Sequence, residues 1–149
     1  MNNSKIDYYD YLRFAVLIVD DEPTVRNYFN RLFCQKFQVL TASSSEQALE
    51  LLQRGTPEIA VMITRQAIAD PEFLAEVVDG YPDLVRILSV SYPEIDMIIG
   101  MVNQEGTFRY VITPWDVPQL EVTLRRAIEF FTVKRERDEL LSARMQAAG

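Results

Sequence analysis

Five short apolar runs alternate along this chain with stretches whose apolar residues recur three and four positions apart. The runs are FAVLIV (14–19), FQVLT (37–41), EIAVMIT (58–64), LVRILSV (84–90) and FRYVIT (108–113). Continuous apolar runs with β-branched residues are typical of strands that are buried on both faces. Because each right-handed crossover between parallel strands needs its helix, the alternation predicts an α/β protein: a five-stranded parallel sheet with helices on both sides.

The helices are predicted between these runs, and several of their ends carry recognisable signals. The predicted ranges are 22–35, 43–55, 71–80 and 93–106, followed by a last helix from Asp116 onward. Pro23 suits the first turn of the first helix. Ser44 or Ser45 can cap the second helix, and Gly55 can end it.

The last predicted helix continues past the apolar face that it turns toward the core. That face carries Leu120, Leu124, Ala127, Ile128 and Phe131. The segment 132–149 has no proline, no glycine before its last residue, and charges of alternating sign, so we expect the helix to continue into solvent. Val133, Leu140 and Ala147 lie seven positions apart, and Ala143 lies between the last two. This spacing leaves two interpretations, a short coiled-coil seam that forms a dimer or leads to an output, and a solvated helical tail. The predicted organisation is an arm (1–13), an α/β domain (14–131) and a helical extension or linker (132–149).

Composition excludes several kinds of site. The chain has 149 residues, which fits one domain, and it contains one cysteine and no histidine. Cys34, which falls inside the first predicted helix, can form neither a disulfide nor a cysteine-based zinc site within one chain. The missing histidine excludes histidine-based metal ligation and catalytic triads. A net charge of −7 argues against nucleic acid or an anionic membrane as a partner of this domain. No apolar run reaches the length of a membrane span and the polar N-terminus is unlike a signal peptide, so we expect a cytoplasmic protein.

Candidate chemistry lies at the ends of the first and third apolar runs. Asp20 and Asp21 follow the first run in VDDEP, and Arg65 follows Thr64 at the end of the third. The carboxyl ends of parallel strands meet at one edge of the sheet, where open α/β proteins keep their active sites. Two adjacent carboxylates at such an edge usually hold a hard cation such as Mg²⁺, pair with a basic side chain, or cap the following helix.

Four segments together resemble the receiver domain of two-component response regulators. They are VDDEP, TASSSEQALELL, YPDLVRIL and RYVITPWD, and the similarity covers about residues 14–131. The Pro-Trp pair after the fifth strand and a helical linker like VKRERDELLS are most similar to receivers of the hydrogenase-regulator kind. The resemblance implies a doubly wound, flavodoxin-like sheet of strand order 2-1-3-4-5. It also implies a site at the carboxyl ends of strands one, three, four and five, where an aspartate accepts a phosphoryl group from a kinase histidine with the help of Mg²⁺.

This sequence departs from the pattern at the positions that carry the reaction. The resemblance places Arg65 at the phosphoacceptor position, Val90 at the position of a phosphate-binding hydroxyl, Thr113 at that of a lysine, Tyr110 at an aromatic switch position, and Asp20 and Asp21 at the acidic pair. Arg65 cannot form a stable acyl phosphate, and its fixed charge opposes a divalent cation. A shift of the alignment by one residue would bring Thr64, Ser89 or Ser91 into the site, but no carboxylate.

We therefore hypothesise that Arg65 replaces the metal by bridging to Asp20, Asp21 or both, so that no metal is needed. The competing interpretation is that Arg65 extends into solvent while Asp20 only caps the first helix. If a metal is bound after all, its ligands would be Asp20 and Asp21.

The resemblance also implies a face through which the domain signals. Candidate residues of this face are Met97, Met101, Phe108, Tyr110 and Trp115, although the same residues would equally suit the completion of the core. Our first prediction is a non-enzymatic, degenerate receiver that works through protein partners, with self-association as a homodimer through the last helix. The alternative is a Mg²⁺-dependent phosphoacceptor receiver that controls an output. In either case a histidine kinase or an output domain is a candidate partner, and the domain could be the sensory part of a longer regulator.

Overall fold

The fold is a single five-stranded parallel sheet with helices on both faces. The computed structural model describes residues 10–65, 67–95 and 108–148. The elements are β1 (Ala15–Val19), α1 (Pro23–Phe33), β2 (Gln38–Ala42), α2 (Ser45–Arg54), β3 (Ile59–Arg65), α3 (Pro71–Gly80), β4 (Val85–Ser91), the 3-10 turn η2 (Tyr92–Glu94), β5 (Phe108–Thr113) and α5 (Val117–Ala148). The strand order is β2-β1-β3-β4-β5, with every neighbouring pair parallel. The predicted fold class and strand order are confirmed.

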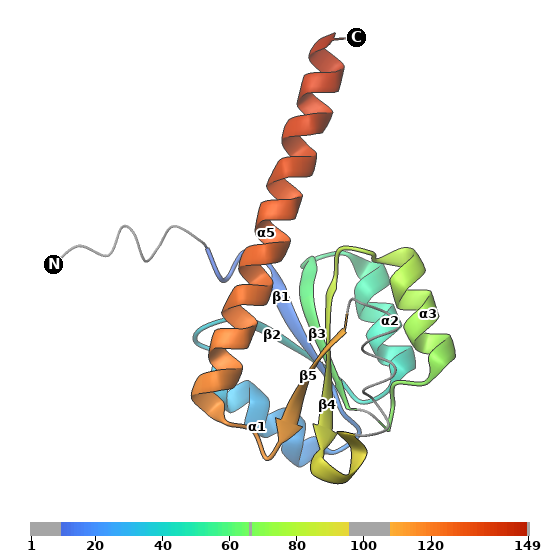
Figure 1. The fold of residues 1–149 in the computed structure, drawn as a ribbon, viewed down its shortest axis with the longest axis vertical. Coiled ribbons are helices and arrows are strands. Elements are labelled where there is room, and N and C mark those ends of the chain that lie inside the picture. The colour runs from blue at the N-terminus through green and yellow to red at the C-terminus, as the bar shows by residue number, and fades with distance from the viewer. Residues whose placement is uncertain (1–9, 66, 96–107, 149) are drawn as a thin grey trace, which may run out of the picture.

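Two hydrophobic layers enclose the sheet, because alternate residues of each strand point to opposite faces. On β1, Leu17 and Val19 contact the layer under α2 and α3, whereas Val16 and Ile18 contact the layer under α1 and α5. Figure 1 shows α1 and α5 on one side of the sheet and α2 and α3 on the other. β1 and β3 are buried on both faces, which explains why the first and third runs are continuously apolar.

Local signals fix most element boundaries close to their predicted positions. Ser44, rather than Ser45, is the N-cap of α2, and its hydroxyl accepts a hydrogen bond from the Gln47 N–H at 3.1 Å. Gly55 ends α2 in the left-handed conformation, with φ of 73°. The third helix and the fifth strand span their predicted residues.

Two of the predicted boundaries change. The first helix ends at Phe33, so Cys34 is its C-cap residue and is exposed rather than lying inside the helix. Residues 92–94 form the 3-10 turn where the start of a fourth helix was expected, and most of the predicted range 93–106 lies outside the described residues.

The last helix is long and leaves the body of the domain. α5 spans 32 residues as one continuous helix, as the pattern predicted. In Figure 1 it starts near α1, crosses the sheet, and projects beyond the edge opposite to the one toward which β4 and β5 point. None of the helices in the described part of the chain is long and apolar enough to cross a membrane.

Candidate functional site

A pocket of about 250 Å³ lies at the carboxyl edge of the sheet. It is lined by Asp20, Glu22, Val25, Arg65, Ser89, Ser91, Glu94 and Thr113. These residues come from the β1–α1 connection, α1, the ends of β3, β4 and β5, and η2, because parallel strands end at a common edge. Asp20 and Arg65 therefore lie together, as the sequence predicted, whereas Asp21 is not part of the pocket lining.

Asp20 is turned inward and organises the start of α1. Its side chain is only 5% exposed, and its Oδ1 accepts a hydrogen bond from the Glu22 N–H at 2.9 Å. Its backbone carbonyl accepts a second bond from Arg26 Nη1 at 2.7 Å. Burial raises the pKa of the Asp20 carboxyl, although the Glu22 bond and the charge of Arg65 act in the opposite direction. Asp20 therefore stabilises the turn before α1 through its bond to Glu22, although its carboxylate charge is partly desolvated.

Arg65 is the last residue of β3 and pairs with the other carboxylate. Its Nη1 donates to Asp21 Oδ1 at 2.6 Å, and the two side chains are 41% and 57% exposed. This hydrogen bond lowers the pKa of Asp21 and raises that of Arg65. Of the predicted contacts, the bridge to Asp21 is formed, while Arg65 acts on Asp20 through charge alone. The competing interpretation is correct in one respect, because Asp20 does satisfy a backbone N–H at the helix start.

The hydroxyl groups of the pocket come from positions on either side of Val90. Val90 is buried in the core layer beneath α2 and α3, so its side chain does not line the pocket. Ser89 and Ser91 line it instead, as the alternative alignment allowed. Side chains alternate along β4, and a shift of one residue therefore exchanges the pocket face for the core face. The third alternative, Thr64, is buried and lies outside the pocket lining.

These hydroxyl groups already have partners in the protein. The Ser89 hydroxyl accepts a hydrogen bond from Trp115 Nε1 at 3.2 Å, and the Ser91 hydroxyl donates to Glu94 Oε1 at 3.0 Å. Thr113, which lines the pocket where the family pattern has a lysine, donates its hydroxyl proton to the Val90 carbonyl at 3.3 Å. Among the described residues, Arg65 is the one basic side chain in the lining. In the same part of the chain, no three acidic, histidine or cysteine side chains cluster where they could hold a metal ion.

The predicted signalling face is described only in part. Met97 and Met101 lie outside the described residues, and Phe108 belongs to β5 without a described side chain. Tyr110 and Trp115 line a groove of about 540 Å³, together with Tyr92, Val111, Ile112, Pro114, Asp116, Gln119, Leu120 and Thr123. Tyr110 is 42% exposed.

Sequence reasoning missed the environment of Trp115. Its indole ring stacks on Tyr28 of α1, with ring centroids 6.2 Å apart, and meets the edge of Phe29 at 5.7 Å. Through its bond to Ser89, Trp115 also touches a residue of the pocket. Tyr28 lies on the exposed side of α1, one residue from the buried Phe29, and no pattern in the sequence indicated its contact with Trp115.

Comparisons with known proteins agree with this architecture. No protein-family model matches the sequence. The chain is 36% identical over 116 residues to the hydrogenase transcriptional regulatory protein HoxA of Cupriavidus necator, which covers 77% of this chain and 24% of HoxA. It is 30% identical over 123 residues to the regulatory protein AtoC of Escherichia coli, with 81% of this chain and 26% of AtoC covered. The chain thus spans about a quarter of the length of these relatives.

Solved structures give the same result. The signal receiver domain of an HD domain-containing protein from Pseudomonas fluorescens has a TM-score of 0.73 at 28% identity, covering 87% of this chain and 96% of that one. A response regulator receiver domain protein from Clostridium thermocellum has a TM-score of 0.67 at 27% identity, covering 86% and 98%. The predicted similarity to receivers, including those of hydrogenase regulators, is confirmed. The chain is a receiver domain of the kind found in two-component response regulators.

Proposed function

We propose that this receiver domain signals without accepting a phosphoryl group and acts through contacts with other proteins. The observation that carries the proposal is the pair between Arg65 and Asp21, which stands where the family resemblance expects an acceptor aspartate beside a metal. A guanidinium stays protonated and cannot form a stable acyl phosphate. In this proposal the domain has no catalytic activity of its own.

The charges in the pocket support a role for Arg65 in place of a metal. A divalent cation in such a pocket would balance Asp20 and Asp21, and the Arg65 guanidinium supplies a fixed positive charge to the same pair. Its Nη1 also donates a hydrogen bond to Asp21 Oδ1, an oxygen that a metal would need as a ligand. The residues present therefore do not fit Mg²⁺ well, and no step that requires it is proposed.

The exposed half of α5 supports self-association. Val133 and Leu140 are exposed, the latter at 71%, and Ala147 is exposed one heptad further on. Leucine and valine at a seven-residue spacing form a seam that a second copy of the helix can cover. We propose a homodimer through this seam, with a histidine kinase or an output domain as further partners.

Phosphorylation of the whole chain tests the proposal. Incubation with acetyl phosphate and MgCl₂, followed by intact-mass analysis, should leave the natural chain unmodified, whereas Arg65→Asp should restore an acceptor carboxylate and gain one phosphoryl group. Arg65→Asn is the matched control, because asparagine has nearly the shape of aspartate but no carboxylate, and it should stay unmodified. Phosphorylation of the natural chain would favour the alternative, a Mg²⁺-dependent receiver with an unusual acceptor.

A further inference from the structure

The outer half of α5 has no core contacts to hold it. Phe131, which packs edge-on against Phe14 with centroids 4.9 Å apart, and Thr132 are the last buried residues of the helix, at 3% and 6% exposure. From residue 133 to residue 147 no described side chain is buried. Whatever fixes the direction of this segment must therefore act at the surface.

Ion pairs join this segment to the amino-terminal ends of three strands. The pairs, which we call the ionic collar, are Lys134 with Asp83 (2.6 Å), Arg135 with Glu58, Arg13 with Glu136 (3.6 Å), and Arg13 with Glu139 (3.7 Å). Arg13, Glu58 and Asp83 lie just before β1, β3 and β4, respectively. The collar is thus a set of partly exposed contacts around the point where α5 leaves the domain.

Thr132, two residues before the first collar residue of α5, makes a side-chain bond to the helix backbone. Its hydroxyl donates to the Ile128 carbonyl at 2.7 Å, a carbonyl four residues back. Bonds of this kind compete with the helical ladder and often bend helices. Because Thr132 is the last buried residue and the collar begins two residues later, a bend here would move the outer segment while leaving the core contacts intact.

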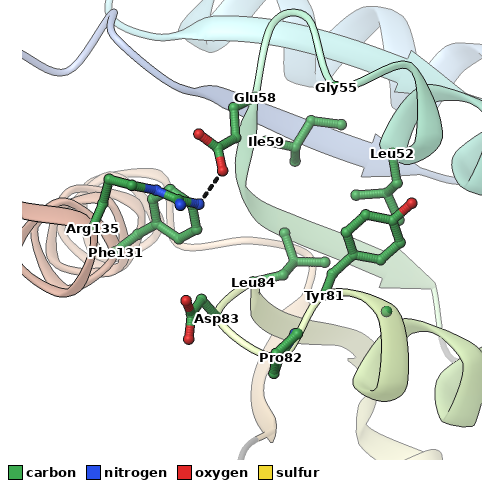
Figure 2. A pocket seen from close by; sticks show the side chains of 11 residues that line it. Leu52, Gly55, Glu58, Ile59, Tyr81, Pro82, Asp83, Leu84, Phe131 and Arg135 are labelled. Carbon is green, nitrogen blue, oxygen red and sulfur yellow. Dashed lines mark hydrogen bonds and ion pairs between the residues drawn. The ribbon is translucent and has the colours of Figure 1, made fainter. Parts of the chain in front are cut away.

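Space for such a movement exists on one side of the helix. A cavity of about 280 Å³ lies between α5 and the connections that precede β3 and β4. Figure 2 shows Phe131 and Arg135 on one side of it and Leu52, Ile59 and Tyr81 on the other, with Arg135 reaching Glu58. Within the described structure, the Arg135 Nε is buried and has no hydrogen-bond partner, while the guanidinium lies over the Phe131 ring, 5.3 Å from its centroid.

We propose that Thr132 is a pivot and that the ionic collar is the clamp that fixes the direction of the outer half of α5. When the collar is broken, the helix beyond Thr132 tilts over the cavity. The clamp would determine where the exposed seam of α5 is presented. The inference goes beyond the proposed function, because it does not depend on whether the pocket accepts a phosphoryl group or whether the seam binds a second copy.

Distances between two spin labels in the full chain test whether the ionic collar fixes the direction of α5. Cys34 is the only cysteine, so Cys34→Ser gives a background in which labels can be placed at Asn27→Cys on α1 and Met145→Cys on α5. Met145 lies roughly 20 Å beyond Thr132 along the helix, so a tilt of about 20° would move its label by about 7 Å. Dilution into an excess of unlabelled protein removes distances between copies.

The collar is opened from the body side, which leaves the sequence of α5 unchanged. Glu58→Arg and Asp83→Lys, singly or together, should broaden the distance distribution. Adding Arg135→Glu to the Glu58→Arg single variant exchanges the two charges of that pair and should narrow the distribution again. Glu50→Arg, an equal charge change on the exposed side of α2, should have no effect. Hydrogen exchange of amides beyond residue 132 should accelerate about 1.5- to 5-fold for each pair lost.

Salt provides a test that needs no substitution. High salt weakens exposed ion pairs, the Arg13 pairs at 3.6 and 3.7 Å most of all, so the distance distribution of the natural chain should broaden at 1 M NaCl. Two results would overturn the proposal: an unchanged distribution in the Glu58→Arg and Asp83→Lys double variant, or a broadening that the charge exchange fails to reverse.

Discussion

The pairing of Arg65 with Asp21 predicts how the pocket responds to magnesium. Arg65→Asp removes the guanidinium and adds a carboxylate near Asp20 and Asp21, in a pocket that Glu22 and Glu94 also line. The lost pair is well exposed, at 41% and 57%, and pairs of this kind contribute little. Without metal the melting temperature should therefore fall by only a few degrees, roughly 1–4 °C, the added repulsion included.

Magnesium should then separate the variant from the natural chain. A ligand that binds only the folded state stabilises it by an amount that grows with the ratio of its concentration to Kd, about 2.7 kcal/mol at a hundredfold ratio. For a chain of this length such a gain corresponds to a rise in melting temperature of roughly 5–10 °C. Thermal unfolding followed by circular dichroism, with MgCl₂ against NaCl of equal ionic strength, measures the difference.

The natural chain should show no magnesium-specific rise, because Arg65 already occupies Asp21. Arg144→Asp, an equal charge change on the exposed part of α5, controls for net charge and should also show none. The reasoning would be refuted if magnesium stabilised the natural chain as much as it stabilises Arg65→Asp. A variant that folds but ignores magnesium would equally refute the claim that Arg65 stands in a metal's place.

Two further predictions concern Asp20 and the α5 seam. The pKa of the Asp20 carboxyl is raised in the folded state, so the native protein still binds the carboxyl proton at pH values where the unfolded chain has released it. The contribution of Asp20 to the free energy of unfolding therefore falls as the pH rises above the ordinary pKa of 3.8. Asp20→Asn, whose amide oxygen can still accept from Glu22 N–H, should therefore be more stable than the natural chain at pH 7 in urea unfolding, with the difference shrinking in acid; a less stable variant at pH 7 would contradict this. Leu140→Glu should convert the proposed dimer to a monomer in light scattering without lowering the melting temperature of the receiver body, whereas Arg137→Glu on the same exposed segment should leave the mass unchanged.

The fold was predictable because its signals are local and periodic. The apolar runs fixed the strands, and α3 lies where Pro71, with Asp70 as its cap, begins a helix. The meeting of Asp20, Asp21 and Arg65 followed from the rule that parallel strands share a carboxyl edge. These are properties of single segments or of strand direction, and neither requires knowledge of side-chain packing.

The details that failed depend on choices between neighbouring side chains. Asp20 and Asp21 are adjacent in sequence, yet one accepts a backbone N–H inside the turn and the other meets Arg65 in partial solvent. Val90 and its two serine neighbours differ only in which face of β4 they occupy, and that depends on where the helical layers lie. The partners of the ionic collar lie far apart along the chain, so their pairing requires the path of α5 across the sheet.

The pocket and the collar are connected by the strands themselves. β1 leads from Arg13 to Asp20, β3 from Glu58 to Arg65, and β4 from Asp83 to Ser89, so three of the four strands that end at the pocket also begin beside a charge that pairs with α5. Strands buried on both faces are stiff, close-packed elements, and a change at one end is therefore transmitted as a small displacement rather than absorbed. The pocket is a polar cluster beside a single guanidinium, and the collar is a set of half-exposed pairs that are individually weak. A displacement too small to disturb the core can thus be large enough to exchange partners in the collar. If a displacement at the pocket reaches the other end of these strands, the weak pairs of the collar are the contacts that it exchanges most readily.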